Sequence, residues 1–401
     1  MNHMPKGRSP FYPGQPVPVE LFAGRQEQLD YILARGVRQV EAGKPVTMFV
    51  QGEYGIGKSS LAGYMQRVAE KQHGLHPIYA SLGRAEKVED VGAAVIEATV
   101  QSGGHDSNRG EKIKKWLAKY IDDLSLFGVT VRLDALKEDA PQISTNMLPF
   151  LSQALDKLKD TGVKGIFLVL DEINGISANA RFAHFIKGLV DTNAMSRKPL
   201  PLLLMLCGVE ERRRDMIQKH EPVGRVFDVV EIGPMPDAEI KDFFRRAFAS
   251  ERMAVDKGAL RVLAQYSAGF PKIMHILGEA AYFADRDGTV DGFDAVDALY
   301  QAVDEVGKRY VDQQVYRALR SRDYHAILKK IADSPYRMSF IKSELAAKLT
   351  SSEKAKLNNF LQRMKKLNVL RSGDVRGEYV FNMRMVYLYI WLQSQEKKPT
   401  T

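Results

Sequence analysis

The chain has 401 residues, 45% of them hydrophobic, and a formal net charge of +9, so it is long enough for two or three globular domains. Its single cysteine, Cys207, excludes an internal disulfide and is typical of a reducing cytoplasm. No apolar run reaches the ~18 residues of a membrane span, the N-terminus lacks the apolar region of a signal peptide, and the histidines show no metal-ligand spacing. We therefore expect a cytoplasmic protein without a membrane partner.

The positive charge is confined to the end of the chain. Residues 1–320 hold 42 basic and 42 acidic side chains, whereas residues 321–401 hold 16 and 7 and carry the whole excess of +9. A neutral body with a basic C-terminal module indicates an anionic partner for that module.

One segment matches the phosphate-binding loop pattern G-x-x-x-x-G-K-[ST]. It reads Gly52-Glu53-Tyr54-Gly55-Ile56-Gly57-Lys58-Ser59, with Ser60 next. A β-rich apolar run at 46–50 precedes it and a helical pattern at 60–65 follows, as a loop that wraps a phosphate at a helix N-terminus requires. We expect Lys58 to reach the β- and γ-phosphates of ATP, and the Ser59 hydroxyl to bind Mg²⁺.

A second motif supplies carboxylates. Residues 165–170 form a continuous apolar run that ends in Asp171 and Glu172, which is typical of a buried parallel strand. Ligands bind at the carboxyl ends of such strands. We expect Asp171 to hold Mg²⁺ through its water shell, and Glu172 to orient and deprotonate the attacking water. The two motifs together predict hydrolysis of a nucleoside triphosphate.

Alternating elements predict an α/β domain over residues 21–235, with a parallel sheet and helices on both faces. Residues 1–20, rich in proline and glycine, predict an extended arm. The strands are expected at 46–51, 77–82, 166–171, 202–207 and 227–232. Within an insertion at 83–164, to which we assign no role, residues 103–108 resemble a mobile loop and residues 127–133 an extra strand.

Residues 236–320 predict an all-α domain. Helical spacing of apolar residues and an acidic cap define the first helix at 237–252. Three more helices are expected at 256–268, 271–286 and 292–318.

Residues 321–395 predict a winged-helix domain. Three short helices are expected at 324–332, 341–349 and 353–367, and they precede a two-stranded hairpin at 369–371 and 379–381. In the third helix one face is apolar and the opposite face is polar. Amide side chains can pair with adenine edges, and basic ones with guanine or phosphate. The candidate DNA contacts are Asn359, Gln362, Arg363, Lys365 and Lys366, with Arg376 in the hairpin. A protein contact or an ordinary solvated face remains an alternative.

Taken together, residues 17–393 resemble the AAA+ ATPases of the initiator branch, which includes origin-recognition proteins, bacterial initiator-loader relatives and ATPase regulators of transposition. The resemblance implies a P-loop NTPase sheet, a helical lid over ATP, and assembly of several copies through shared ATP sites. It also implies that the segment containing Gly24 and Arg25 lies against the adenine.

Three further positions follow from the resemblance. The strand at 202–207 ends in Cys207, where the family usually has a polar sensor of the γ-phosphate. Arg225 lies where the family places an arginine finger for the neighbouring subunit, and the run at 212–214 offers competing arginines. Lys272 matches the second sensor, where the family favours arginine. Lysine keeps the charge but lacks the bidentate fork.

The sequence therefore predicts an ATP-driven switch that forms homo-oligomers and engages double-stranded DNA. The alternative is a STAND-like signalling or defence ATPase whose winged helix docks a protein partner. A small-molecule kinase fits less well, because it needs neither such a lid nor a basic winged helix.

Overall fold

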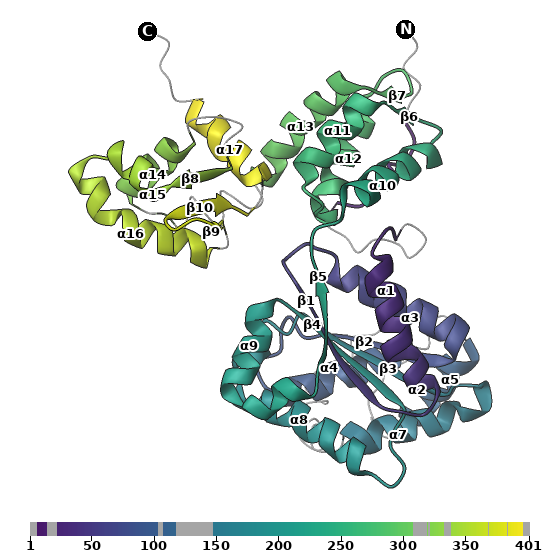
Figure 1. The fold of residues 1–401 in the computed structure, drawn as a ribbon. Helices are drawn as coiled ribbons and strands as arrows, with labels where there is room; N and C mark the ends of the chain where they lie inside the picture. The colour runs from purple at the N-terminus through teal and green to yellow at the C-terminus, as the bar shows by residue number, and fades with distance from the viewer. Residues whose placement is uncertain are drawn as a thin grey trace. The chain divides into compact units, whose positions relative to one another are not determined.

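The computed structural model describes residues 6–13, 22–102, 107–117, 147–307, 319, 321–332, 338–367, 369–382 and 384–395 (Figure 1). The chain divides into two compact units. One comprises residues 16–233, and the other comprises residues 1–15 together with residues 234–401.

A parallel five-stranded sheet forms the centre of the first unit, in the order β2-β3-β4-β1-β5. Its strands are β1 (Val46–Gly52), β2 (Leu75–Ser81), β3 (Gly165–Asp171), β4 (Leu202–Gly208) and β5 (Asp228–Ile232). All residues of β3 and β4 are buried, as their continuous apolar sequences predict. The predicted parallel α/β fold is confirmed. Because the strands are parallel, the ends of β1 and β3, which carry the two motifs, meet at one edge of the sheet.

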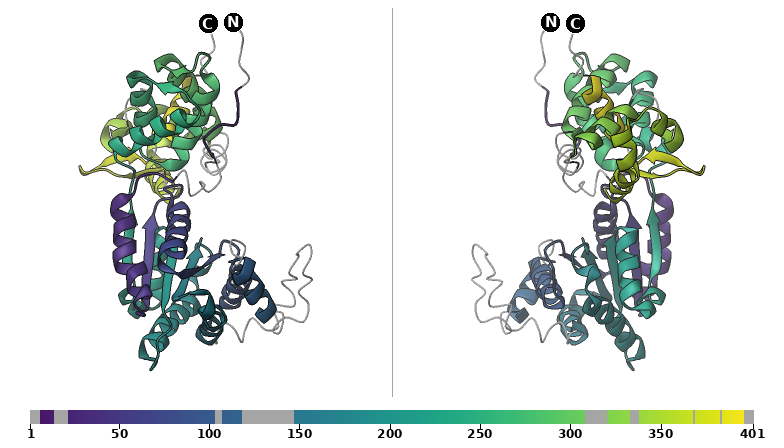
Figure 2. Two further views of the ribbon diagram at one scale, coloured as in Figure 1. Left: turned by 90° about the vertical axis from the view of Figure 1, so that its right-hand side faces the viewer. Right: turned by 90° about the vertical axis from the view of Figure 1, so that its left-hand side faces the viewer.

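Helices cover both faces of this sheet (Figure 2). On one face lie α1 (Gln26–Ile32), η2 (Leu33–Val37), α2 (Arg38–Glu41) and α3 (Lys58–His73). The chain approaches the sheet closely at Gly36, where an added Cβ would lie 3.0 Å from the Met48 side chain.

The opposite face holds the main hydrophobic cluster, in which Ile166, Leu168 and Leu170 of β3 pack against surrounding helices. The helices and 3-10 turns after β2 and β3 are α4 (Val88–Gln101), α5 (Ser107–Leu117), α7 (Met147–Leu158), η4 (Lys159–Thr161), η5 (Ile176–Ala178) and α8 (Ala180–Met195). After β4 come α9 (Glu210–Lys219) and η6 (Glu221–Arg225).

Helices account for much of the insertion at 83–164. The predicted loop at 103–108 is wrong at its end, because Ser107 and Asn108 begin α5. Residues 103–106 and the strand expected at 127–133 lie outside the described residues.

The second unit begins with the predicted helical region: α10 (Asp237–Ser250), α11 (Lys257–Ser267), α12 (Pro271–Ala284) and α13 (Gly292–Val306). Two short strands, β6 (Ala254–Val255) and β7 (Thr289–Val290), pair between them. The last helix was expected to reach residue 318, and residues 308–318 lie outside the described part.

The N-terminal segment 6–13 packs on this helical region. Phe11 is 3% exposed, and its ring contacts Phe243 and Phe248 at centroid distances of 5.9 and 5.1 Å. Gly278 makes room for that ring, since an added Cβ would lie 2.2 Å from it. Lys6 forms an ion pair with Asp285 at 3.1 Å. The arm is therefore anchored by its own hydrophobic residue.

The C-terminal part contains α14 (Arg322–Ile331), α15 (Lys342–Ala347), α16 (Ser351–Lys366), β9 (Leu370–Ser372) and β10 (Glu378–Phe381), close to the predicted positions. Two elements were not predicted: β8 (Ser339–Ile341), which pairs with β10, and α17 (Arg384–Gln395). The helix α17 contacts both α14 and α13. No helix among the described residues combines the length and apolar character needed to cross a membrane.

Candidate active site

The loop between β1 and α3 depends on its glycines. At Gly52 an added Cβ would lie 2.6 Å from the carbonyl oxygen of Ile232, so no larger residue fits. Gly55 and Gly57 have φ values of +77° and +102°, in the left-handed region that favours glycine. The 16-residue helix α3 then starts at Lys58. The loop thus wraps the N-terminal end of a long helix, which is a site for an anion.

Arg25 binds the backbone of this loop through its side chain. Its side chain is buried, with 6% exposure, and it donates hydrogen bonds to the carbonyl oxygens of Gly233 and, at 3.1 Å, Ile56. Gly24 and Arg25 both have positive φ, +69° and +66°, which turns the chain into position. The two hydrogen bonds tie the Arg25 guanidinium to the backbone of the loop at Ile56 and to the backbone after β5 at Gly233. The predicted adenine contact of this segment stays a prediction.

Asp171 is held by donors from three elements. Its Oδ2 accepts a hydrogen bond from Ser59 Oγ at 2.5 Å and another from the hydroxyl of Tyr79, while its Oδ1 accepts from the backbone N–H of Glu172 at 2.7 Å. Asp171 is 4% exposed. Such a set of donors fixes the orientation of the carboxylate.

Glu172 adopts a strained backbone. Its φ is +56°, in the left-handed region that non-glycine residues rarely occupy. The side chain is exposed, and its Oε2 accepts a hydrogen bond from Ser81 Oγ at 3.0 Å. Gly83 leaves the space for it, because an added Cβ would lie 2.4 Å from Oε2. The carboxylate thus lies over the end of β2, in reach of solvent.

Lys58 donates to the loop in this structure. Its Nζ lies 2.9 Å from the carbonyl oxygen of Gly52 and 2.8 Å from that of Glu53. Burial lowers the pKa of the ammonium below its ordinary value, and the negative charge of Asp171 opposes that shift. A half-buried cation beside neutral carbonyls favours an incoming anion.

Sequence reasoning missed the contribution of β2. Tyr79 and Ser81 come from this strand, whose register places Ser81 opposite Asp171. The signal was available in part: the strand expected at 77–82 has polar residues at alternating positions near its end. Only the strand order shows that β2 borders β3.

The oxygen atoms of Ser59 and Asp171 fit a magnesium ion. Mg²⁺ prefers oxygen ligands, keeps several waters, and uses one or two protein groups together with phosphate. Two hard oxygen donors converge here at 2.5 Å, next to the loop. Among the described residues no group of three or more His, Cys, Asp or Glu side chains could hold a metal, so the protein offers no closed metal cage there.

Cys207 is fully buried at the end of β4, and burial raises the pKa of its thiol. A buried neutral thiol is a weak hydrogen-bond donor. The predicted departure from a polar sensor at this position therefore has a chemical consequence, namely a poorer contact for a phosphate.

The competing arginines differ in their surroundings. The side chain of Arg225 is 80% exposed and lies 3.7 Å from Glu221. In α9, Arg213 Nε donates to the buried Gln51 at 2.9 Å, next to the loop. Arg212 and Arg214 form ion pairs along their own helix. The exposure of Arg225 favours it for a contact with another molecule. The predicted second sensor, Lys272, lies in the other compact unit, at the start of α12.

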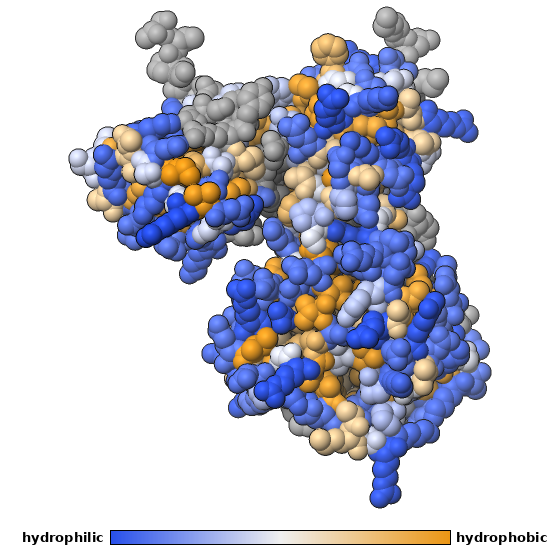
Figure 3. Space-filling model, in the orientation of Figure 1, coloured by the Kyte–Doolittle hydropathy of each residue, from blue (hydrophilic) through white to orange (hydrophobic). Residues whose placement is uncertain are grey.

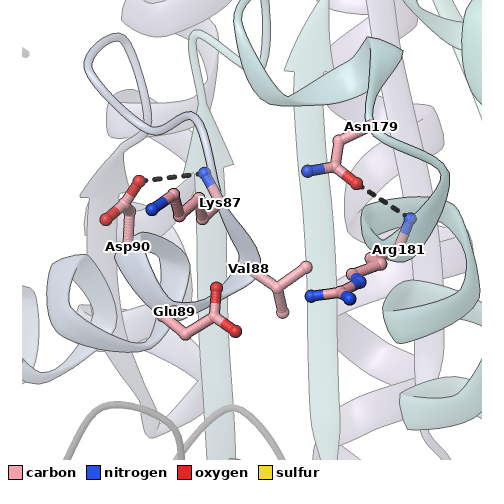
Figure 4. Close-up of a pocket in the computed structure, with 6 residues that line it drawn as sticks. All are labelled: Lys87, Val88, Glu89, Asp90, Asn179 and Arg181. Atoms are coloured by element: carbon pink, nitrogen blue, oxygen red, sulfur yellow. Dashed lines mark hydrogen bonds between the residues drawn. The ribbon is translucent and has the colours of Figure 1, made fainter. Parts of the chain in front are cut away.

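A pocket of about 510 Å³ lies in the unit formed by residues 16–233, away from the predicted site residues (Figure 4). The N-terminal ends of α4 and α8 form it, through Lys87, Val88, Glu89, Asp90, Asn179 and Arg181. Asp90 accepts from the backbone of Lys87, and Asn179 from that of Arg181, so these side chains serve as helix caps. None of the predicted site residues lines this pocket, and we assign it no ligand.

The predicted DNA-contacting side chains lie on α16 and the hairpin. Asn359, Gln362, Arg363, Lys366 and Arg376 are exposed. Lys365 is half-buried instead: its Nζ donates to Ser372 Oγ at 2.6 Å and lies 5.4 Å from the ring centroid of Tyr379. The opposite face of α16 is buried through Leu357, Phe360, Leu361 and Met364.

The parallel sheet and the loop at the end of β1 define a P-loop ATPase fold. The structure is similar to that of the Walker-type ATPase PABY2304 of Pyrococcus abyssi, with a TM-score of 0.57, 19% identity, and coverage of 92% of this chain and 96% of that one. Weaker similarity links it to the ORC2 protein of Aeropyrum pernix (TM-score 0.48, 14% identity, coverage 94% and 96%). For the Cdc6p protein of Pyrobaculum aerophilum the TM-score is 0.49 and the identity 11%, with coverage of 97% of this chain and 98% of that one.

No family model matches the chain, and no curated protein matches its sequence. The similarity to the Walker-type ATPase confirms the predicted P-loop fold, and membership of the initiator branch stays a prediction.

Proposed function

We propose that the protein binds ATP with Mg²⁺ and hydrolyses it, as a molecular switch. The observation that carries the proposal is the convergence of Lys58, Ser59, Asp171 and Glu172 at the ends of β1 and β3. The similarity to a Walker-type ATPase supports it.

The residues divide the work as follows. Loop N–H groups from Gly52 to Ser60 surround the phosphates, and Lys58 exchanges two carbonyl partners for phosphate oxygens. Ser59 and Asp171 would hold Mg²⁺, which neutralises developing charge on the phosphates. Glu172 accepts the proton of the attacking water once its carboxylate leaves Ser81.

The proposal also includes predicted ATP contacts from outside the two motifs, namely from the N-terminal segment, the lid domain and a neighbouring copy. The segment at Gly24 and Arg25 would approach the adenine, and Lys272 would approach the γ-phosphate from the lid domain. The exposed Arg225 would enter the site of a neighbouring copy, which makes the active form a homo-oligomer. The division into an α/β domain, a lid at 236–320 and a C-terminal module, together with the cytoplasmic location, also stays a prediction.

For residues 321–395 we propose a winged helix that binds double-stranded DNA. Its support is the order of three helices and a hairpin, the excess charge of +9 over residues 321–401, and the exposed polar face of α16. The alternative is a STAND-like signalling ATPase in which this module docks a protein. Both alternatives use the same ATP chemistry, so only binding experiments separate them.

The deciding experiment compares the wild type with Lys58→Ala. Calorimetric titration with MgATP should show binding in the wild type and none in the variant, and hydrolysis should be lost with it. Fluorescence anisotropy with duplex DNA, with and without ATP, then separates the two alternatives. Equal ATP affinity in wild type and variant would contradict the site.

A further inference from the structure

The helix α13 exposes apolar side chains on the side away from its own core. Phe293 is 83% exposed, Val296 41% and Tyr300 53%. The spacing of three and four residues aligns them on one face, which we call the α13 stripe. The side that packs inward carries Ala295, Ala298, Leu299, Ala302 and Val303, all 6% exposed or less.

The two faces lie roughly 120° apart around the helix axis at 100° per residue. The exposed side chains of the stripe are therefore on a different face of the helix from the side chains that pack in the core. Apolar side chains also appear among hydrophilic ones on the surface of Figure 3, in the region where Figure 1 places α11 to α13. Three exposed large apolar residues on one helix face mark an interaction surface.

The sequence of α13 and of the segment before it is acidic. Residues 279–306 contain eight Asp and Glu residues and a single basic residue, Arg286. Asp297 is exposed within the stripe itself. Burial and then the nearby carboxylates, of which Asp291 is one, raise the pKa of Asp294, as expected where negative charge accumulates. The surface repels nucleic acid and attracts a cationic partner that carries apolar side chains.

The same chain contains such a surface. Residues 321–401 carry the excess of +9. At the turn between β9 and β10, Val375 is 63% exposed and lies between Asp374 and Arg376, and the two arginines of the hairpin, Arg371 and Arg376, are balanced by Asp374 and Glu378. The positive charge beside this turn comes from the end of α16, where Arg363 and Lys366 are exposed and Lys365 donates to Ser372 of β9. Within one copy the hairpin does not cover the stripe, because Phe293 is 83% exposed in the compact unit that contains both α13 and the hairpin.

We infer that the α13 stripe docks the hairpin and the adjoining basic end of α16 of a second copy. Phe293 and Tyr300 contact Val375 of that copy, and Asp297 faces its Arg376. The contact is head-to-tail, because different surfaces meet, so a pair of copies still has one free stripe and one free hairpin at its two ends. It requires no nucleotide and differs in this from assembly through shared ATP sites. DNA competes for the same hairpin, which couples release from the oligomer to DNA binding.

The test is self-association of the full chain without nucleotide, measured by sedimentation velocity over protein concentration and salt. We expect a concentration-dependent oligomer that weakens with rising salt. The double variant Phe293→Ser and Tyr300→Ser should weaken its dissociation constant by about tenfold or more. The control is Met195→Ser, which removes an 85% exposed apolar side chain from α8 and should change nothing.

A charge exchange tests the pairing itself. Asp297→Lys and Arg376→Glu should each weaken self-association, and a mixture of the two proteins should restore a complex. Thermal melting and MgATP binding of each variant show that it is folded. A monomer at all concentrations in low salt, or self-association that the stripe variants leave unchanged, would overturn the inference whether or not ATP or DNA is bound.

Discussion

The hydroxyl of Tyr79 donates a hydrogen bond to the same Asp171 oxygen, Oδ2, that accepts from Ser59. Tyr79 lies on β2 and Asp171 at the end of β3, and the two strands are neighbours in the sheet. Burial, followed by the charge of Asp171, raises the pKa of the phenol well above its ordinary value, so Tyr79 remains a donor at any working pH. The carboxylate therefore keeps one support when Ser59 turns toward a metal.

Removing that support should weaken the metal-dependent part of nucleotide binding. For Tyr79→Phe we expect the affinity for ATP without Mg²⁺ to stay the same and the affinity for MgATP to fall by roughly fivefold to thirtyfold, because a missing hydrogen bond to a charged group costs about 1–2 kcal/mol. Calorimetry at several Mg²⁺ concentrations measures both. The control is Tyr31→Phe, which removes a similar hydrogen bond to Asp228 at 3.1 Å on the surface of the same unit.

Glu172 and Ser81 should separate binding from chemistry. Glu172→Gln removes the proposed base, so hydrolysis should slow by ~10²–10⁴-fold while MgATP affinity stays within a few-fold. Ser81→Ala removes only the hydrogen bond at 3.0 Å and should change the rate by less than about tenfold. Single-turnover hydrolysis measures both variants. Normal turnover of Glu172→Gln would move the base role to another residue.

The sequence predicted the elements that carry strong local signals. The loop glycines, the apolar run before Asp171 and the five parallel strands all follow from residue type and spacing. The contacts of Tyr79, Ser81 and Arg25 did not follow, because they depend on which strands and loops become neighbours. Likewise β8 is only 3 residues long, too short for a period of two to stand out.

A shared ATP site predicts complementation. Arg225→Ala should bind MgATP like the wild type and hydrolyse it poorly, because a finger acts on the neighbouring copy. A mixture with Lys58→Ala should regain part of the activity, since each variant supplies what the other lacks. Arg214→Ala, tested in the same way, decides between Arg225 and a competing candidate, whose side chain is 63% exposed and pairs within α9. Activity per molecule that is independent of concentration, together with no rescue, would exclude a shared site.

Acid should destabilise the second unit through His275. Burial lowers the pKa of this imidazole to about 4, and its Nδ1 accepts from the backbone N–H of Tyr12 at 3.2 Å. The unfolded chain, with a pKa near 6.5, takes up a proton first as the pH falls, so stability is present above pH 6.5 and is lost toward pH 4. The loss between pH 6.5 and 4.5 is roughly 2–3 kcal/mol.

Urea unfolding at several pH values checks this prediction. The chain has two tryptophans, of which Trp116 lies in the first unit and Trp391 in the second. In a Trp116→Phe background, fluorescence of Trp391 therefore reports the second unit alone. His275→Asn should lower stability at neutral pH and make it depend less on pH. An equal pH dependence with and without His275 would show that other groups cause it.

The last prediction concerns the basic module and duplex DNA. Lysine and arginine side chains that bind phosphate release counterions from DNA, so log affinity should fall linearly with log salt, by ~0.9 per phosphate bound. Replacing Arg363, Lys366 and Arg376 with glutamate should weaken binding to all sequences and flatten that slope by up to about 0.9 for each phosphate that is no longer neutralised. These three side chains are exposed, whereas Lys365 is held by Ser372 and is left in place.

A charge-matched control makes the same change on the other unit. Arg197, Lys198 and Lys219 are exposed there, and their replacement with glutamate should leave the salt slope as it is. Asn359→Ala should instead matter only on a preferred sequence, by ~1–3 kcal/mol for the removal of a bidentate hydrogen bond to a base. Anisotropy with labelled duplexes measures both effects. ATP should tighten binding of the full chain, because assembly brings several basic modules to one duplex. If neither form binds duplex DNA at low salt, the exposed face of α16 serves a protein partner, and the signalling alternative accounts better for the module.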